Sequence, residues 1–272
     1  ITIADASAKS LLSIINDILD FSKIEAGKVE LDNIEFDAKK EIGNFAKSIA
    51  ITVKNKDVEL LLDLSSLEHS YMYADIGRLK QILNNLVGNA IKFTHEGNII
   101  IKAHLDDIED THAKLIVSVE DSGIGIPKEK LENIFDAFTQ ADSSTTRQYG
   151  GTGLGLSIAK NLVECMGGSI VISSTFGEGS SFTFSIDVTL SNKQPPKMPF
   201  TDIRGQKILI VDDNMVNIKI LTTQLQLWDI EVTPALSAKE AIELCNANAE
   251  EDCFDVAILD MQMPEKDGET LG

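Results

Sequence analysis

The sequence lacks the features that would place it in a membrane or a secretory pathway. No apolar run approaches the roughly 18 residues needed to cross a bilayer, and the start, Ile1 to Asp5, has neither an initiator methionine nor the pattern of a signal peptide. Cysteine is scarce, and its three positions have no metal-binding spacing: Cys165, Cys245 and Cys253. These absences predict a cytoplasmic piece of a longer protein, with buried or idle cysteines, and leave open whether the parent is anchored in the inner membrane.

Positive charge is also in short supply. Lysine and arginine number 24 against 43 acidic residues, which gives a formal net charge of −19. Such a surface repels phosphate backbones and anionic lipid head groups, so neither nucleic acid nor a membrane is an expected partner. A polyphosphate ligand would need Mg²⁺ and a few placed cations. The length of 272 residues is enough for about two domains.

The stretch 85–94 places polar side chains where an amphipathic helix should be apolar or solvated. At about 100° per residue, Asn85, Asn89 and Lys92 fall within one narrow arc. A broad apolar arc lies beside it: Leu79, Ile82, Leu83, Leu86, Val87, Ala90 and Ile91. A solvated face is the ordinary explanation for three polar residues at this spacing. Three later segments favour a ligand-binding edge instead.

Upstream of this helix, which Asp75 should cap, the sequence predicts further helices and strands. Apolar residues at helical spacing run from Leu11 to Phe21, with a stop at Gly27. Their stripe is wide enough for a helical bundle that a second copy of the chain could complete. Then follow a strand over 34–36, a helix over 38–53 capped by Asp37, and a buried strand over 58–64.

Downstream, residues 98–105 and 114–120 alternate as strands do, and an acidic loop over 106–111 should join them. The sheet is therefore expected to be at least partly antiparallel. The second strand ends in Asp121, followed by Gly123 and Gly125, which allow the backbone to approach a ligand closely. The carboxylate could accept a hydrogen bond from an exocyclic amine, although this pattern alone is more often a turn than a site.

A second glycine-rich segment follows a short helix over 128–135 and a polar run over 136–149 that predicts a mobile loop. It consists of Gly151, Thr152, Gly153, Leu154 and Gly155 and precedes a helix over 157–166. Glycines that open a helix expose backbone N–H groups to an anion. The spacing fits neither a P-loop nor the Gly-x-Gly-x-x-Gly fingerprint. Strands over 169–173 and 181–190 complete the sheet.

In this order the motifs resemble the kinase core of sensor histidine kinases. The surroundings of Asn89 resemble the family's N box, residues 121–125 the first glycine box, Phe135 and Phe138 the F box, and residues 151–155 the second glycine box. The resemblance implies an α/β fold of Bergerat type, in which a mixed sheet lies under three helices and a lid covers ATP. It makes residues 1–28 the second helix of a dimerisation and phosphoacceptor hairpin, and residues 29–190 the ATP-binding catalytic domain.

The resemblance also implies roles for single residues. Asn89 would be the side-chain ligand of the Mg²⁺ bound with ATP, and Asn85 and Lys92 would lie close to the phosphates. Asp121 would hydrogen-bond the adenine amino group, and Arg147 would meet the outer phosphates. The nucleotide would also lie against glycine-box residues: Gly123, Gly125, Gly151, Thr152, Gly153, Leu154 and Gly155. Gln148 occupies a position that is often basic in relatives, so contacts between the lid and the nucleotide are expected to be weaker. Phe135 and Phe138 fit the role of core aromatics under the lid slightly better than that of F-box residues.

The phosphoacceptor motif of the family, His-Glu/Asp-x-x-x-Pro, does not occur in the sequence. The four histidines are His69, His95, His104 and His112. Only His95 is followed by an acidic residue, and Gly97 then favours a turn. The substrate histidine is therefore expected upstream of Ile1, in the parent protein.

A proline-containing linker over 191–205 separates this region from a different pattern. A buried parallel strand over 207–211 leads into Asp212 and Asp213, and a helix, a strand over 230–234 and a helix over 238–246 follow. Another strand, over 256–259, ends in Asp260. Three carboxylates at the ends of adjacent parallel strands suit a hard cation.

Residues 206–272 resemble the N-terminal half of a response-regulator receiver domain, with Met263, Pro264, Asp267 and Gly268 as further matches. The resemblance implies that Asp260 is the phosphoacceptor, that Asp212, Asp213 and Asp260 hold Mg²⁺, and that the carbonyl of Gln262 adds a ligand. A half-receiver ending at Gly272 is expected to be poorly ordered or to borrow cover from a neighbouring chain.

The sequence thus predicts part of a hybrid histidine kinase that passes the γ-phosphoryl group of Mg-ATP to a histidine and then to Asp260. Its expected partners are a second copy of the chain, a phosphoacceptor hairpin, and a receiver or downstream phosphotransfer protein. Two other functions stay open, a nucleotide-gated binding module without phosphoryl transfer and a phosphoryl sink acting through Asp260.

Overall fold

The protein is represented by a computed structural model, which describes residues 11–12, 15, 18–53, 56–139, 153–193, 203–247, 253–261 and 263. Its contacts divide the chain into two compact units, Ile1–Pro195 and Pro196–Gly272. Across the described residues, no helix has both the length and the apolar character to span a membrane.

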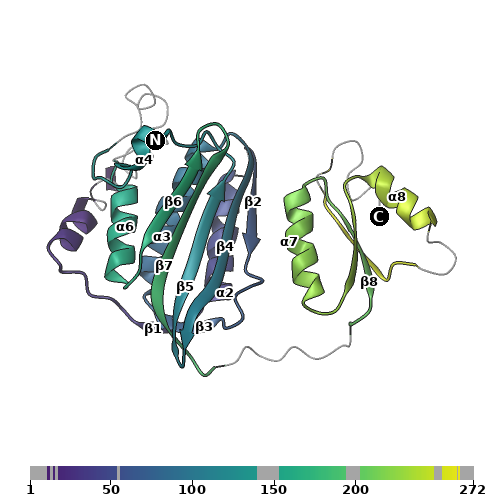
Figure 1. Ribbon diagram of the computed structural model, residues 1–272, viewed down its shortest axis with the longest axis horizontal. Coiled ribbons are helices and arrows are strands. Elements are labelled where there is room, and N and C mark those ends of the chain that lie inside the picture. The colour runs from purple at the N-terminus through teal and green to yellow at the C-terminus, as the bar shows by residue number, and fades with distance from the viewer. Residues whose placement is uncertain are drawn as a thin grey trace, which may run out of the picture. The chain divides into compact units, whose positions relative to one another are not determined.

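A seven-stranded mixed sheet forms the first unit (Figure 1). Its path runs β1-β3-β7-β5-β4-β2, and β6 also pairs with β7. Among the described strands of this sheet, only β2 and β4 pair in parallel, and the other neighbours are antiparallel. The strands are β1 (Ile34–Asp37), β2 (Asp57–Asp63), β3 (Tyr71–Ala74), β4 (Glu96–Glu109), β5 (His112–Asp121), β6 (Ile170–Thr175) and β7 (Gly179–Leu190).

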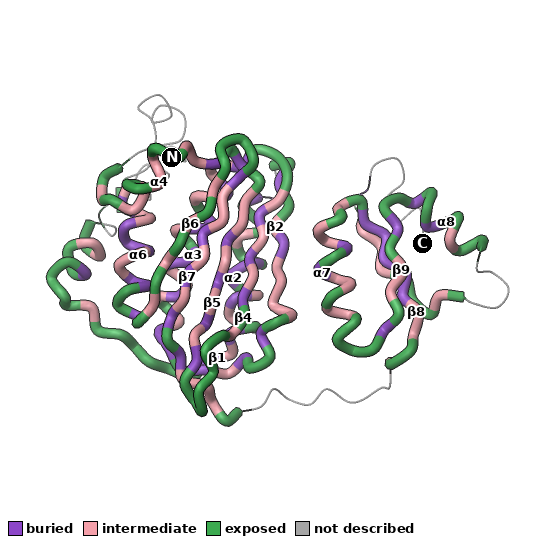
Figure 2. The backbone as a smooth tube through the Cα atoms, in the orientation of Figure 1, coloured by how far each residue is buried: buried purple, intermediate pink, exposed green. Residues whose placement is uncertain are grey.

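Helices cover one face of this sheet, the far face in Figure 1. They are α2 (Ala38–Val53), α3 (Ile76–Phe93) and α6 (Gly155–Cys165), with a short α4 (Lys128–Leu131) near the edge. Inward positions of the strands alternate with more exposed ones, as the purple and pink segments of Figure 2 show. The inward residues pack with α2, α3 and α6 into one apolar core, which confirms the expected mixed-sheet α/β sandwich.

Local signals fix where the helices begin and end. The Asp75 carboxylate accepts a hydrogen bond from the N–H of Arg78 at 3.0 Å and so caps α3, as predicted. The Asp37 carboxylate likewise accepts from the N–H of Lys40 at 3.3 Å at the start of α2. Residues 18–25 are helical, and the chain turns directly after them at Gly27, whose φ of +62° permits this turn.

Several predicted elements differ from the structure. Strand β3 was not expected, although Met72 and Ala74 are buried. The predicted acidic loop is wrong, because β4 continues to Glu109 and β5 starts at His112, which leaves a tight turn between them. The predicted buried strand is β2, the end strand of the sheet. Helix α6 begins two residues early, and α4 ends at Leu131.

The second unit contains a three-stranded parallel sheet in the order β10-β8-β9. Its strands are β8 (Lys207–Val211), β9 (Glu231–Ala235) and β10 (Val256–Leu259), and its helices are α7 (Met215–Gln226) and α8 (Ala238–Ala247). The central strand β8 is almost wholly buried, as expected for a parallel strand covered on both faces. Two small apolar clusters lie on the two faces.

Candidate functional site

The three polar residues predicted to share one edge of α3 do so in the structure. Asn85, Asn89 and Lys92 are half-buried, and the neighbouring arc is fully buried as predicted. The amide of Asn85 lies against the start of α6, because a Cβ on Gly155 would come 3.4 Å from Asn85 Oδ1. Burial lowers the pKa of Lys92, whose ammonium lies 4.9 Å from the Phe93 ring centroid. The edge therefore combines two amides and a partly desolvated cation next to a helix N-terminus.

The carboxylate of Asp121 lies at the end of β5, close to the C-terminal end of α3. Its Oδ1 accepts a hydrogen bond from the N–H of Gly123 at 2.9 Å. Burial raises the pKa of Asp121, while hydrogen bonds from the N–H groups of Gly123 and Ser180 act in the opposite direction. A partly buried carboxylate with spare lone pairs can accept a further hydrogen bond from a ligand.

The two glycines after Asp121 are required by close backbone packing. A Cβ on Gly123 would lie 2.5 Å from the Phe93 carbonyl oxygen and 2.8 Å from Asp121 Oδ1. Gly125 has a φ of +65°, and a Cβ there would collide with the carbonyl oxygen of Thr175. The first glycine box thus brings its backbone directly against α3 on one side and the end of β6 on the other.

The second glycine box opens α6. Gly153 has a φ of +71°, and its carbonyl accepts a hydrogen bond from the N–H of Phe138 at 3.1 Å. Helix α6 begins at Gly155, and Leu154 before it provides no side-chain cap. First-turn N–H groups of a helix have no partner inside the helix and favour an anion. Four predicted positions lie outside the described residues: Arg147, Gln148, Gly151 and Thr152.

The two aromatic residues of the predicted F box differ in how far they are buried. Phe135 is half-buried and packs edge-to-face on Phe182, with ring centroids 6.4 Å apart, as expected of a core aromatic. Phe138 is 67% exposed, so the expected core role is wrong for it. Its φ is +64°. Its ring centroid lies 6.3 Å from that of Phe21, in the N-terminal helix over residues 18–25. Phe138 therefore joins the N-terminal helix to the loop beside Gly153.

In the second unit, the three predicted carboxylates come together. Oxygen atoms of Asp212, Asp213 and Asp260 all lie within 4.8 Å of one another. Asp212 is 4% exposed, and its Oδ1 accepts from the N–H of Asn214 at 2.8 Å, while Asn217 donates to its Oδ2. Burial raises the pKa of Asp212, and the charges of Asp260 and Asp213 act in the same direction. This oxygen donor set fits a hard divalent cation.

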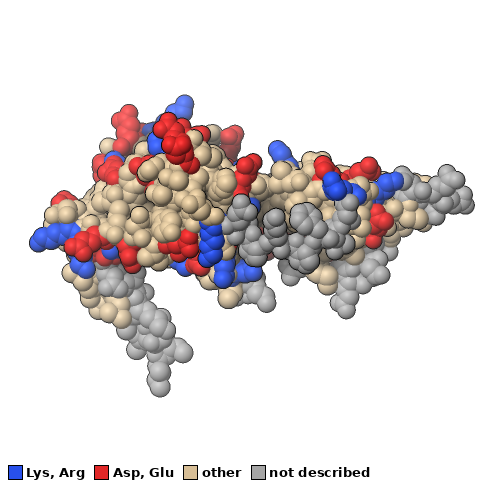
Figure 3. Space-filling model, turned by 90° about the horizontal axis from the view of Figure 1, so that it is seen from below, with Lys and Arg blue, Asp and Glu red and all other residues tan. Residues whose placement is uncertain are grey.

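The structure also bears on the expectations for the histidines, the cysteines and the last receiver residues. All four histidines are exposed, and none lies in a helix. The three cysteines are exposed, which excludes burial and leaves the other expectation, that they are idle. The carbonyl of Gln262 and residues 264–268 lie outside the described part of the chain. On the face drawn in Figure 3, lysines and arginines lie among aspartates and glutamates.

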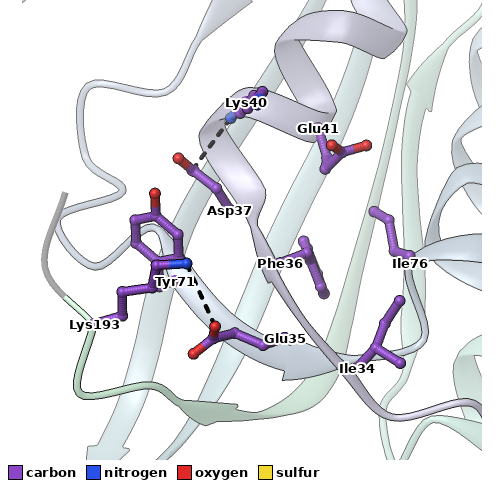
Figure 4. Close-up of a pocket in the computed structure, with 9 residues that line it drawn as sticks. All are labelled: Ile34, Glu35, Phe36, Asp37, Lys40, Glu41, Tyr71, Ile76 and Lys193. Carbon is purple, nitrogen blue, oxygen red and sulfur yellow. Dashed lines mark hydrogen bonds and ion pairs between the residues drawn. The ribbon is translucent and has the colours of Figure 1, made fainter. Parts of the chain in front are cut away.

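Sequence reasoning missed a pocket of about 410 Å³ at the start of α2 (Figure 4). There, Lys193 lies 3.6 Å from the Glu35 carboxylate and 4.7 Å from the Tyr71 ring centroid. None of the predicted site residues lines it. No sequence pattern identifies the role of Lys56 either. Its ammonium donates a hydrogen bond to the Ile91 carbonyl at 2.6 Å, which completes the last turn of α3.

Comparison with known families supports two domains. Residues 74–190 match the family "Histidine kinase-, DNA gyrase B-, and HSP90-like ATPase". Residues 208–272 match the response regulator receiver domain. The first range contains the α3 edge and both glycine boxes, and the second contains the three clustered carboxylates.

Several curated proteins are similar over most of the chain. Sensor histidine kinase GacS of Pseudomonas protegens is 39% identical over 94% of the chain and 28% of its own length. Autoinducer 2 sensor kinase/phosphatase LuxQ of Vibrio vulnificus is 36% identical over 96% of the chain and 31% of its own length. Signal transduction histidine-protein kinase BarA of Escherichia coli is 39% identical over 86% of the chain and 26% of its own length. The chain spans less than a third of each of these relatives.

Solved structures show the same fold. Full-length ShkA in complex with AMPPNP has a TM-score of 0.73 and 27% identity, over 89% of this chain and 49% of that one. Histidine kinase ThkA in complex with response regulator protein TrrA has a TM-score of 0.50 and 28% identity, over 69% of this chain and 50% of that one.

Proposed function

We propose, because the chain belongs to the sensor histidine kinases of two-component signalling, that its first unit binds Mg-ATP and transfers the γ-phosphoryl group to a histidine. That histidine would lie on a phosphoacceptor helix, since none of the four histidines here lies in a helix. The phosphoryl group would then pass to Asp260. Residues 1–28 would belong to the dimerisation hairpin, 29–190 to the catalytic domain, 191–205 to a linker and 206–272 to the receiver.

One observation carries this proposal. The polar edge of α3 runs from the N-terminus of α6, beside Asn85, to the carboxylate of Asp121, beside the end of α3. Asn85 and Phe93, the last residue of α3, are about 12 Å apart along the helix at 1.5 Å per residue. A nucleotide lying along this edge would have its phosphates at the helix N-terminus and its base at the carboxylate.

The chemistry of each residue suits its end of the nucleotide. Asp121 can accept a hydrogen bond from the exocyclic amine of adenine. Lys92 and the dipole of α6 supply positive charge for the phosphates of a ligand that the net charge of −19 would otherwise repel. Asn89 offers an amide oxygen for the Mg²⁺ that neutralises the phosphate oxygens. Arg147 remains our candidate for the outer phosphates.

The receiver would take the phosphoryl group on the carboxylate of Asp260. Asp212, Asp213 and Asp260 would hold Mg²⁺, which lowers charge repulsion when a carboxylate attacks a phosphoryl group. The positions of these three groups at the ends of β8 and β10 support this assignment.

We also propose that the N-terminal helix pairs with a second copy of the chain. Its apolar residues remain exposed in the single chain: Leu11, Leu12, Ile15, Ile18 and Leu19 are 43 to 60% exposed. An exposed apolar stripe on a helix is usually covered by a partner. The further partners of such a dimer would be a receiver or a downstream phosphotransfer protein, in the cytoplasm.

The proposed function is tested by incubating the chain with labelled ATP and Mg²⁺ in the presence of a separately supplied phosphoacceptor hairpin. We expect acid-labile, base-stable label on the hairpin, and loss of that label in Asn89→Ala. Asp260→Asn serves as the matched control and should still label the hairpin. ATP binding without any label would instead indicate a nucleotide-gated module, and label that reaches Asp260 only from an already phosphorylated donor would indicate a phosphoryl sink.

A further inference from the structure

The N-terminal helix over residues 18–25 is bound to α3 by a hydrogen bond between two side chains. The Gln81 amide donates to the Asp20 carboxylate at 2.7 Å, across 61 positions of the sequence. Arg78 orients this amide, because its guanidinium donates to Gln81 Oε1 at 2.9 Å. All three residues are half-buried. Turning the amide over would bring two acceptors together on one side and two donors on the other, so both neighbours fix its orientation.

Gln81 and Arg78 extend the polar edge of α3 toward the start of the helix. At about 100° per residue, both fall in the arc that Asn85, Asn89 and Lys92 share. Gln81 precedes Asn85 by about 6 Å along the helix axis, and the amide of Asn85 lies against the start of α6. The edge therefore continues past the phosphate end of the proposed nucleotide site, and its continuation carries the contact with the N-terminal helix.

A second contact joins the N-terminal helix to the loop before α6. Phe21 follows Asp20 directly, and its ring centroid lies 6.3 Å from that of Phe138. The N–H of Phe138 donates to the Gly153 carbonyl, two residues before the start of α6. One turn along the N-terminal helix, Ile24 is 9% exposed and packs into the core. Polar and apolar contacts therefore hold this helix at the end of the site where the phosphates of ATP are proposed to lie.

The position of this helix matters for the proposed reaction. The bond between the γ-phosphorus and the ADP oxygen breaks as a histidine nitrogen bonds to phosphorus, which requires donor and acceptor to be held in line. We infer that Gln81, oriented by Arg78, is a positioning residue for this transfer, because it binds Asp20 and so holds the hairpin helix at the phosphate end of the site. The inference rests on the proposed function and names the residues that bring the hairpin to the nucleotide.

The test exchanges the donor and the acceptor of this hydrogen bond. Gln81→Glu places a second carboxylate opposite Asp20, and Asp20→Asn in the same chain then supplies a new amide donor and returns the net charge to that of the wild type. Each chain is incubated with labelled ATP, Mg²⁺ and a synthetic amphipathic helix that carries the motif His-Glu/Asp-x-x-x-Pro and can pair with the apolar stripe of the N-terminal helix.

We expect Gln81→Glu to lower the maximal labelling rate about 3- to 10-fold, because a half-exposed hydrogen bond to a charged group is lost. The double variant should recover to within about twofold of the wild type. The concentration of added helix that gives half the maximal rate should stay the same, because that helix would pair with the N-terminal helix and not with Gln81.

Hydrogen exchange of the backbone amides in residues 18–25, measured without nucleotide, reports on the docking itself. It should speed up about 3- to 10-fold in Gln81→Glu and return to within about twofold of the wild-type rate in the double variant, whether or not the added helix is labelled. Asn84→Glu is the matched control, because it adds the same charge to an exposed position of α3 and should change neither rate.

The inference is overturned by a folded Gln81→Glu that labels the added helix at the wild-type rate, which would make the contact purely structural, or by a double variant that recovers neither rate. Should Gln81→Glu not fold, Gln81→Leu replaces it; this variant should show the same losses, and Asp20→Asn should not restore them. Mg-ATP binding by the wild type is measured by calorimetry in parallel. Absent binding would reject the proposed function, whereas normal binding with unchanged exchange in Gln81→Glu would reject only the role of Gln81.

Discussion

Replacing Asp121 by alanine is the sharpest test of the base end of the site. The carboxylate is partly buried at the end of β5, and burial raises its pKa. The substitution removes the acceptor that the adenine amine would use. It also leaves the N–H of Gly123, now bonded at 2.9 Å, without its acceptor.

The expected loss of ATP affinity follows from the charge of that acceptor. A hydrogen bond to a charged group contributes about 1.5 to 3 kcal/mol, which corresponds to roughly 10- to 150-fold in the dissociation constant. The same variant should lose preference for ATP over GTP, because the group that repels the guanine carbonyl is gone. The phosphates contribute equally to both nucleotides and should keep residual binding measurable.

Calorimetric titration with ATP and GTP gives both quantities in one experiment. Thermal unfolding of the nucleotide-free variant is the control, because two backbone donors lose their acceptor and the fold itself could weaken. Asp260→Asn provides a matched loss of a carboxylate in the other unit and should leave ATP affinity unchanged. A folded Asp121→Ala with the wild-type ratio of ATP to GTP affinity would remove this residue from the site.

Three other substitutions or conditions test the remaining assignments. Asn89→Ala should weaken Mg-ATP binding strongly while the unfolding temperature stays near that of the wild type, because the side chain lies beside the buried arc and not in it. ATP affinity should fall at alkaline pH as Lys92 loses its proton, and at lower pH than for an ordinary lysine, because burial lowers its pKa; Lys92→Met should lack this dependence. The stability of the nucleotide-free domain should fall as pH rises from the unfolded pKa of Asp121 through its raised folded pKa, because the native state holds the proton more tightly there. Asp121→Asn should remove that slope in unfolding measurements.

The α3 edge could be predicted because helical periodicity is local. Its spacing alone separated Asn85, Asn89 and Lys92 from the buried arc, and Asp75 signalled where the helix begins. The three carboxylates of the second unit could be predicted for a related reason, since parallel strands end at one edge of a sheet. In both cases the regular backbone geometry decides where residues at a given spacing lie, so the spacing can be read from the sequence.

Features built by contacts between distant segments could not be predicted in this way. Strand β3 is only four residues long and pairs with β1 and β7, so its own pattern is too short to identify it. Neither the hydrogen bond from Gln81 to Asp20 nor the hydrogen bond from Lys56 to the last turn of α3 leaves a signal in the local sequence. The exposure of Phe138 depends on where its loop lies, which residue type alone does not decide.

The shifted pKa values of Asp121 and Lys92 connect the fold to the proposed catalysis. Burial disfavours the charged form of both groups, although hydrogen bonds from the N–H groups of Gly123 and Ser180 favour the ionised form of Asp121. The rigid core beneath α3 keeps them in place despite that cost. Adenine and the phosphates would add partners to both groups without reorganising the site, which is how preorganised groups contribute most to binding and phosphoryl transfer. The same burial that destabilises these two charges in the empty domain therefore strengthens their interactions with ATP.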